Sequence, residues 1–275
     1  MLFATHNKPR PLVMGLLNLT PDSFSDGGRF MGRDAALTQA RKLIADGADV
    51  LDLGAESTRP GAVPISEQEE LDRLMPVVEA LVFETDTPLS IDTMKPRVAA
   101  AALAAGASLW NDVSALGWSA DSPAMAARLA CPVVLMHMQG VPASMQSAPC
   151  YDDVVADVAA FLMARAEAAT AAGVAREALW LDPGIGFGKT LEHNLALLRG
   201  LEALTALGFP VLLGASRKRF IAGVDPSASD PMARLGGSLA AALRGAQAGC
   251  AAVRVHDVRE TVQALDVWAA MRRPA

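Results

Sequence analysis

The sequence predicts an α/β fold, a single (β/α)8 TIM barrel, on two observations. Short apolar runs occur eight times along the chain, and each ends in residues suited to binding or catalysis. The segments between them are long enough, and apolar at helical spacing, to be crossover helices. In such a barrel the carboxyl ends of all strands meet on one face, where the active site is built. The pattern therefore predicts one site and identifies the side chains around it.

The predicted strands are residues 12–17, 50–54, 88–91, 107–110, 132–135, 178–181, 210–213 and 251–253. In the same order they lead into Asn18, residues 56–59, Asp92, Asn111 and Asp112, Met136 and His137, Asp182, residues 216–218, and Arg254 and His256. Successive side chains of a strand face opposite sides, so only one member of each neighbouring pair can point into the barrel. Asp52 lies inside its strand rather than at its end, which predicts a structural role.

Capping signals support the predicted crossover helices. The helix at 66–84 begins Ser-Glu-Gln-Glu, a capping box with Ser66 at the N-cap and Glu69 at the third position. The other predicted helices are 33–46, 95–105, 122–130, 151–172, 191–206, 231–247 and 258–272. Connections 20–32, 55–65 and 138–149, after strands 1, 2 and 5, are rich in Gly, Pro and Ser, which predicts long functional loops.

Length and composition favour one domain over residues 1–275. The net charge of −6, without a Lys/Arg run, argues against a nucleic-acid partner. Three cysteines without metal-site or disulfide-framework spacing indicate a reducing compartment. The polar N-terminus lacks the apolar core of a signal peptide, and no apolar stretch is long enough to span a membrane. We therefore expect a soluble, cytoplasmic protein with no membrane partner.

A glycine-rich segment at 184–190 resembles a phosphate-binding P-loop but fails its spacing. That motif requires a glycine five residues before its final glycine, and the chain has Pro183 there. We interpret the segment as a tight connection in which glycine permits unusual backbone angles. Asp182, which precedes it, is kept as a site residue.

Taken together, the motifs at the eight strand ends resemble those of the dihydropteroate synthases, a family of pterin-binding TIM barrels. The matching segments are Gly-Leu-Leu-Asn-Leu-Thr-Pro-Asp-Ser-Phe-Ser-Asp-Gly-Gly, Gly-Ala-Glu-Ser-Thr-Arg-Pro-Gly, Ser-Ile-Asp-Thr, Asn-Asp, Leu-Met-His-Met-Gln-Gly, Leu-Asp-Pro-Gly, Ser-Arg-Lys and Arg-Val-His. They run from about residue 13 to about residue 256. The resemblance implies condensation of 6-hydroxymethyl-7,8-dihydropterin diphosphate with p-aminobenzoate to 7,8-dihydropteroate and diphosphate, a folate-biosynthesis step targeted by sulfonamides.

The resemblance implies a pterin site at the strand ends. A pterin presents adjacent N–H donors and a carbonyl acceptor, which carboxylates and a lysine can bind. The implied pterin contacts are Asp92, Asn111, Met136, Asp182, Phe187, Gly214, Lys218 and Arg254. Those with catalytic roles are Lys218, Asp92, Arg254, His256 and Asp22.

The family pattern also implies where the diphosphate and the metal bind. Asn18, Arg254 and His256 would contact the diphosphate, and Asn18 would also bind a Mg²⁺ shared with it. An amide oxygen suits Mg²⁺, which takes its other ligands from phosphate and water. A simpler alternative pairs Arg254 with Asp257 and uses His256 to cap the last helix.

The second substrate would lie among the loops. Phe24 would contact the p-aminobenzoate ring, and Pro60, Ser216 and Lys218 its far end; Thr58 and Arg59 would stabilise the closed loop, and Asp22 would organise the metal or the loop. We expect an SN1-like displacement without a covalent nucleophile. Cys131 begins a strand at the opposite end of the barrel, and Cys150 has no histidine partner.

Three other interpretations fit parts of the pattern. A methyltetrahydrofolate-dependent methyltransferase would share the Asp and Asn residues but would not need the Ser-Phe-Ser-Asp-Gly-Gly loop, the Ser-Arg-Lys motif or an anion pocket. A non-catalytic pterin-binding relative would lose site residues, and a phosphosugar barrel would not explain the Gly/Pro loops. The apolar residues Val262, Leu265, Val267 and Trp268 could pack on the barrel or form the homodimer interface that the family suggests.

Overall fold

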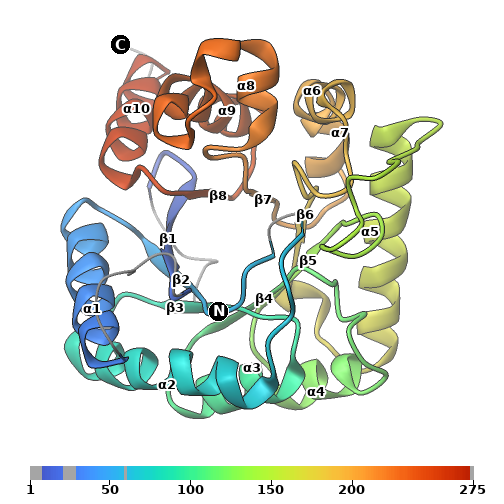
Figure 1. Ribbon diagram of the computed structural model, residues 1–275. Coiled ribbons are helices and arrows are strands. Elements are labelled where there is room, and N and C mark those ends of the chain that lie inside the picture. The colour runs from blue at the N-terminus through green and yellow to red at the C-terminus, as the bar shows by residue number, and fades with distance from the viewer. Residues whose placement is uncertain (1–7, 21–28, 59–60, 273–275) are drawn as a thin grey trace.

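The predicted barrel is confirmed by a computed structural model, which describes residues 8–20, 29–58 and 61–272. Its strands are β1 (Leu12–Asn18), β2 (Val50–Gly54), β3 (Leu89–Asp92), β4 (Leu109–Asp112), β5 (Val133–Met136), β6 (Leu179–Asp182), β7 (Leu212–Leu213) and β8 (Ala252–Val255). They form one parallel sheet in the order β6-β5-β4-β3-β2-β1-β8-β7, with helices around it (Figure 1). A single bridge between Leu181 of β6 and Val211, the residue before β7, closes the barrel.

Helices follow the strands as expected. They are α1 (Arg29–Ala45), α2 (Glu67–Glu84), α3 (Pro96–Ala104), α4 (Ser122–Leu129), α5 (Val154–Ala171), α6 (Leu191–Arg199), α7 (Leu201–Thr205), α8 (Arg219–Val224), α9 (Leu235–Gln247) and α10 (Val258–Met271). The capping box of α2 is half formed. Ser66 Oγ accepts a hydrogen bond from Glu69 N at 3.1 Å, but the Glu69 carboxylate pairs with Arg73 instead of returning to the cap.

Three helix predictions were wrong in detail. Helix α1 begins at Arg29, four positions before the predicted residue 33. The predicted helix 191–206 is divided at Gly200, where a Cβ would lie 2.9 Å from Val155 on α5. The predicted helix 231–247 becomes regular only at Leu235. Before it lies a 3-10 turn, where the Arg234 guanidinium donates to three backbone carbonyls. Helix α8, which was not predicted, precedes that turn.

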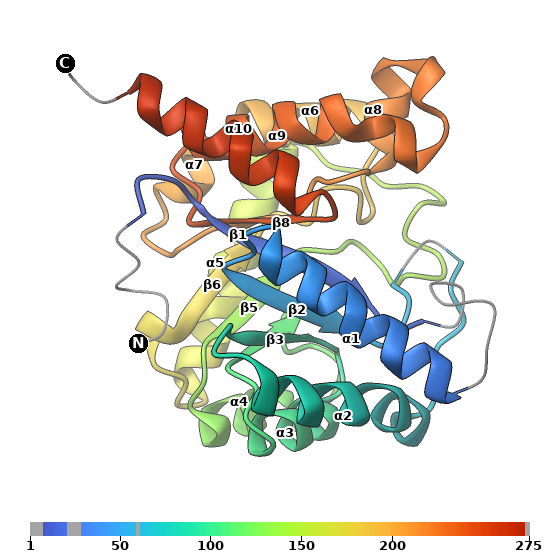
Figure 2. The ribbon, with the colours of Figure 1, turned by 90° about the vertical axis from the view of Figure 1, so that its left-hand side faces the viewer.

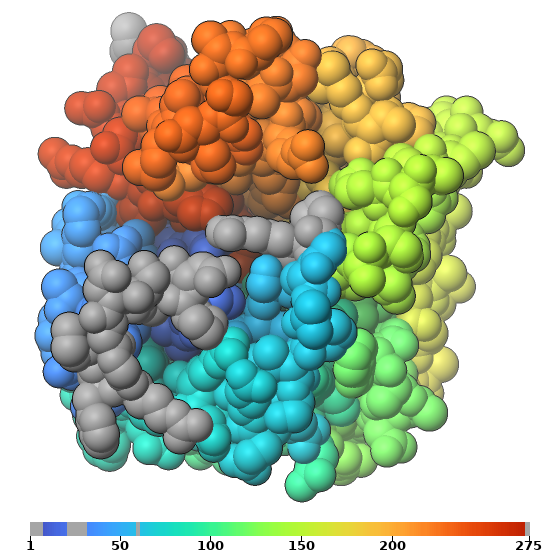
Figure 3. Space-filling view, in the orientation of Figure 1, coloured from blue at the N-terminus to red at the C-terminus, as the bar shows by residue number. Residues whose placement is uncertain are grey.

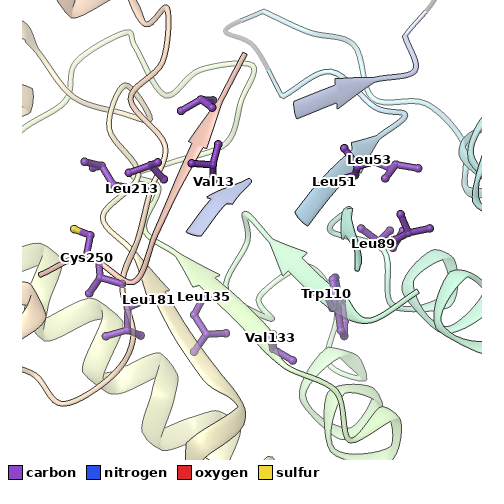
Figure 4. Close-up of a cluster of buried hydrophobic side chains, with 14 of the residues drawn as sticks. Val13, Leu51, Leu53, Leu89, Trp110, Val133, Leu135, Leu181, Leu213 and Cys250 are labelled. Carbon is purple, nitrogen blue, oxygen red and sulfur yellow. The ribbon is translucent and has the colours of Figure 1, made fainter. Parts of the chain in front are cut away.

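The outward face of the strands forms the main core. Leu51, Leu53, Trp110, Leu135 and Leu181 are fully buried against the helices, and Figure 4 shows them with their neighbours. The burial of these large apolar surfaces is the dominant favourable contribution to folding.

The inward face is apolar at one end of the barrel and polar at the other. The apolar layer consists of Leu12, Met14, Val50, Leu109, Val134, Trp180, Leu212 and Ala252. Beyond it, in the same alternation, lie Asp52, Ser90, Asp92, Asn111 and Arg254. The apolar layer therefore fills the barrel beneath a polar chamber at the carboxyl ends of the strands.

The last helix mainly packs on the barrel. Leu265 is fully buried, and Val262 and Trp268 contact the core, whereas Val267 is 55% exposed.

Within the described ranges, no helix is long and apolar enough to cross a membrane.

Trp110→Ala should lower the free energy of unfolding by about 3–5 kcal/mol, because it leaves a large cavity. It also removes the hydrogen bond from Trp110 Nε1 to the Thr93 carbonyl at 2.8 Å. Urea denaturation followed by circular dichroism measures the loss. Phe83→Ala is the control, since that ring is 92% exposed, and should change stability by less than about 0.5 kcal/mol. Equal losses in the two variants would contradict this account of the core.

Candidate active site

The strand ends converge on one face of the barrel. All paired strands are parallel, and Figure 2 shows β1 and β2 directed toward the same side of the molecule. The register places Asp92 beside both Gly54 and Asn111, and Met136 beside Asp182. Side chains from β2, β3 and β4 that are distant in sequence are thereby brought together.

Arg254 is the centre of a charged cluster within the barrel. Its Nε donates to Asp52 Oδ2 and its Nη2 to Asp92 Oδ2, each at 2.6 Å. Asn111 Nδ2 lies 3.3 and 3.4 Å from the two oxygens of Asp52. Three predicted site residues, Asp92, Asn111 and Arg254, thus lie together around Asp52. The sequence predicts only a structural role for Asp52. The signal for Asp52 was its position two residues before Gly54, on the same inward face.

Asp92 has an unused acceptor. Its Oδ1 is buried and has no hydrogen-bond partner among the described residues. Burial raises the pKa of Asp92 to about 7, against the opposing effect of Arg254, while the carboxylates of Asp52, Glu70 and Asp112 raise it further. A buried acceptor without a donor is costly, so this atom is suited to a ligand N–H.

Asp182 and Lys218 lie on the opposite side of the site from Asp92 and form a second wall. Asp182 Oδ1 accepts from Gly184 N at 2.7 Å, and burial raises the pKa of this carboxyl while Lys218 opposes the shift. Lys218 Nζ donates to the Ile185 carbonyl and lies 4.5 Å from the centroid of the Phe187 ring. Burial lowers the pKa of Lys218 to about 8, so the group is still mainly cationic at neutral pH.

An apolar wall lies between these polar groups. Met136 packs with Met94, Val113 and Phe187 in a small buried cluster. His137 faces the other way and makes an edge contact with the Phe161 ring, 4.8 Å between centroids. Only Met136 of the neighbouring pair therefore points inward, in agreement with the strand alternation.

Gly214 lies close to both Asp182 and Arg254. A Cβ at this position would lie 3.6 Å from Asp182 Oδ2 and 3.9 Å from the Arg254 side chain. Gly214 therefore lies at the predicted pterin site, between two of the other implied contacts.

The glycine-rich connection after β6 does not use its lysine for an external anion. Lys189 Nζ lies 2.9 Å from the Gly184 carbonyl, 3.0 Å from the Phe187 carbonyl and 2.9 Å from His137 Nδ1. Burial lowers the pKa of Lys189 to about 7. This lysine holds the connection that carries Phe187, as expected for a tight turn rather than a P-loop.

The Ser-Arg-Lys segment turns sharply at Arg217, which has a φ of +57°. Arg217 pairs with Asp257 through Nε at 3.0 Å, so Asp257 does not pair with Arg254. Ser216 Oγ lies 3.2 Å from His256 N and 3.1 Å from His256 Nδ1. Ser216 therefore contacts His256 after β8, whereas Lys218 contacts the connection after β6.

The loops after β2 and β5 meet over this face. Gly61 N donates to the Pro142 carbonyl at 3.2 Å, and Figure 3 shows the two segments side by side. Glu56 fastens the base of the first loop by accepting from Ile65 N at 2.9 Å and pairing with the buried Lys95 at 3.0 Å. Thr58 is half-buried on this loop. The other loop predictions, Asp22, Phe24, Arg59 and Pro60, lie outside the described residues.

The described residues offer no protein cage for a metal. No group of three or more His, Cys, Asp or Glu side chains in the ranges above could hold an ion. Asn18 ends β1 half-buried beside Gly54, and its single amide oxygen is compatible only with an ion that takes its other ligands from substrate and water.

Comparisons with known proteins agree with this geometry. The family model described as pterin binding enzyme matches residues 14–256. The dihydropteroate synthase of Synechocystis sp. is 45% identical over 264 residues, 96% of this chain and 91% of the relative. That of Haemophilus influenzae is 46% identical, covering 94% of each protein.

Solved structures are similar over the same length. Xanthomonas albilineans dihydropteroate synthase with 4-aminobenzoic acid has a TM-score of 0.91 at 50% identity, covering 97% of this chain and 94% of that chain. The same enzyme in complex with 7,8-dihydropteroate has a TM-score of 0.87 at 47% identity, covering 97% and 95%. A Yersinia pestis dihydropteroate synthase with a sulfonamide drug complex has a TM-score of 0.91 at 46% identity, covering 98% and 97%.

Gly184→Ala should displace the connection after β6, because a Cβ there would lie 1.9 Å from the His137 carbonyl oxygen at a φ of +65°. We expect a stability loss above about 2 kcal/mol, from crowding added to left-handed strain. Gly249→Ala is the matched control, with a φ of +84° and no atom within 4 Å, and should lose only about 1–2 kcal/mol. Thermal unfolding compares the two, and equal losses would show that crowding at Gly184 is relieved without cost.

Proposed function

This chain belongs to the pterin-binding enzyme family, and we propose that it is a transferase that makes 7,8-dihydropteroate. It condenses 6-hydroxymethyl-7,8-dihydropterin diphosphate with p-aminobenzoate and releases diphosphate. The observation that carries this conclusion is the pair of walls in the chamber. Asp92 has an unused buried acceptor, and Lys218 lies with Asp182 opposite it. The nearly full-length similarity to dihydropteroate synthases supports the same reaction.

We propose that the pterin lies between the two walls. Asp182, Asp92 and Asn111 would bind its ring edge, and Lys218 would donate to its carbonyl and ring nitrogen. Met136 and Phe187 would cover its faces. Each hydrogen bond to a charged group contributes about 1.5–3 kcal/mol, so several together fix the orientation of the ring.

For the diphosphate we propose His256, Arg254 and Asn18 as contacts. Asn18 would also bind a Mg²⁺ whose other ligands are substrate oxygens and water. The ion would neutralise charge on the departing diphosphate. Arg254 is held by Asp52 and Asp92, and we expect it to approach the pterin and diphosphate without leaving Asp52.

The proposed chemistry is a displacement at the methylene carbon attached to the pterin. The C–O bond breaks with its electron pair going to diphosphate, the aryl amine nitrogen bonds to the carbon, and the nitrogen loses a proton. The dihydropterin ring stabilises the cationic carbon, which favours an SN1-like route. The buried thiols of Cys131 and Cys250 are poor nucleophiles, because burial raises their pKa values to about 11 and about 12.

We propose that the loops exclude water and form the p-aminobenzoate site. Ser216 and Lys218 would bind the far end of this substrate together with Pro60, and Phe24 would contact its ring. Thr58 and Arg59 would stabilise the closed loop, and Asp22 would organise the loop or the metal.

We further propose a cytoplasmic homodimer. The free cysteines of the described chain suit a reducing compartment, and the exposed Val267 and Met271 on α10 give an apolar surface for a second copy. Sedimentation velocity of the parent protein and of Val267→Asp would test the dimer. A monomeric parent would exclude it.

Diphosphate release tests the proposed reaction directly. The purified protein is incubated with dihydropterin diphosphate and Mg²⁺, with and without p-aminobenzoate, and product mass is measured. We expect release that depends on p-aminobenzoate and yields dihydropteroate. Tight pterin binding without release would instead indicate a non-catalytic relative or a methyltransferase.

Pterin affinity should be highest between about pH 7 and 8. Below the Asp92 pKa of about 7 the protonated carboxyl loses acceptor capacity, and above the Lys218 pKa of about 8 the ammonium becomes neutral. Affinity should therefore fall as pH decreases through the first value and as it increases through the second. Calorimetric titration with 6-hydroxymethylpterin from about two pH units below the first pKa to about two pH units above the second measures the profile.

Variants assign the two limbs of this profile. Asp92→Asn should remove the acidic limb and Lys218→Ala the alkaline limb, each with weaker binding at the optimum. Arg219→Ala, an exposed cation next to Lys218, is the control and should keep both limbs. An acidic limb that persists in Asp92→Asn would assign it to another group.

A further inference from the structure

One fully buried carboxylate connects four strands of the barrel. Asp52 Oδ1 on β2 accepts from Ser90 Oγ of β3 at 2.5 Å, and Asn111 of β4 lies within hydrogen-bond distance of both oxygens. Asp52 Oδ2 accepts from Arg254 Nε of β8 at 2.6 Å. Two of the three partners are residues to which we assigned pterin contacts.

Asp112 provides a comparison of equal burial. Both aspartates have no exposed surface, and both lie in or at the end of barrel strands. Asp112 faces outward, and its hydrogen bonds from described residues all come from its own turn, from the Ser114 backbone and hydroxyl and from Leu116 N. Asp112 stabilises a local turn, whereas Asp52 fixes side chains 38 to 202 positions away.

The balance of charge shows why Asp52 matters for Asp92. Arg254 divides its guanidinium between Asp52, through Nε, and Asp92, through Nη2. Only one oxygen of Asp92 is engaged, and the other has no partner among the described residues. Arginine readily binds a single carboxylate in a bidentate fork. Without the charge on Asp52, the guanidinium would turn onto Asp92 and occupy the oxygen that a pterin donor needs.

We propose that Asp52 is a positioning residue for the pterin, which holds Arg254 and Asn111 in place and thereby keeps Asp92 Oδ1 open for the ligand. Asp52 acts through these neighbours and does not itself touch the substrate. The inference deepens the proposed function and rests on it.

Asp52→Asn keeps the size of the side chain and removes its charge. We expect the Kd for 6-hydroxymethylpterin to rise by at least about tenfold, equivalent to one or more lost hydrogen bonds. The KM for p-aminobenzoate should change by less than about twofold, because no contact near Ser216 is altered. Asp112→Asn is the matched control. It should lower the melting temperature without weakening pterin affinity, because loss of the Asp112 charge favours the ionised form of Asp92.

A double-mutant cycle tests the route through Asp92. The losses of pterin affinity in Asp52→Asn and Asp92→Asn should be less than additive in the combined variant, because both act on the same acceptor. If Asp52→Asn does not fold, Ser90→Ala loosens Asp52 without changing the charge of the cluster. This variant should raise the pterin Kd about two- to fivefold, because the hydroxyl that holds the Asp52 carboxylate is lost.

Different outcomes would refute the proposed function and the positioning role of Asp52. A parent protein that neither binds pterin nor releases diphosphate would refute the proposed function itself. An active parent with Asp52→Asn matching Asp112→Asn in pterin affinity would refute the positioning role alone. Full additivity in the cycle would also overturn it, as would a Ser90→Ala variant with unchanged pterin affinity.

Discussion

The alternation of side chains along a strand is the constraint on which this molecule depends. Once eight parallel strands close into a barrel, every second residue must fit into a shared interior. Near one end those residues are apolar and large, with Trp180 and Met14 among them. At the other end the same alternation delivers Asp92, Asn111 and Arg254 to a common chamber. Packing of the apolar layer therefore supports the polar chamber above it.

The chamber is held by a balance of buried charges. Three carboxylates, Asp52, Asp92 and Asp182, are offset by the cations of Arg254 and Lys218. Burial of an isolated charge is expensive, and each group here has an opposite charge nearby. The pKa values of Asp92 and Lys218 approach neutrality because burial is only partly compensated. The groups that would recognise a ligand are thus those whose charge is easiest to change.

The sequence predicts the barrel well because apolar runs and their polar ends are local signals. The alternation also predicts that only one of Met136 and His137 points inward. The role of Asp52 was not predictable, since its partner Arg254 is 202 positions away and meets it only when the barrel closes. The division at Gly200 depends on contact with α5, which no local pattern contains. Predictions on the loop residues Asp22, Phe24, Arg59 and Pro60 stay predictions.

The closure between β6 and β7 has a consequence for ligand binding. These strands share one bridge, between Leu181 and Val211, whereas β1 and β2 are paired over five positions. Within the described barrel, the β6–β7 junction, called the seam, is therefore the place where neighbouring strands share the fewest paired positions. Asp182 lies at one side of this seam, and Gly214 and Lys218 follow its other side. A ligand that contacts both sides of this junction would add interactions across it. Ligand binding would therefore stabilise the closed form of the barrel.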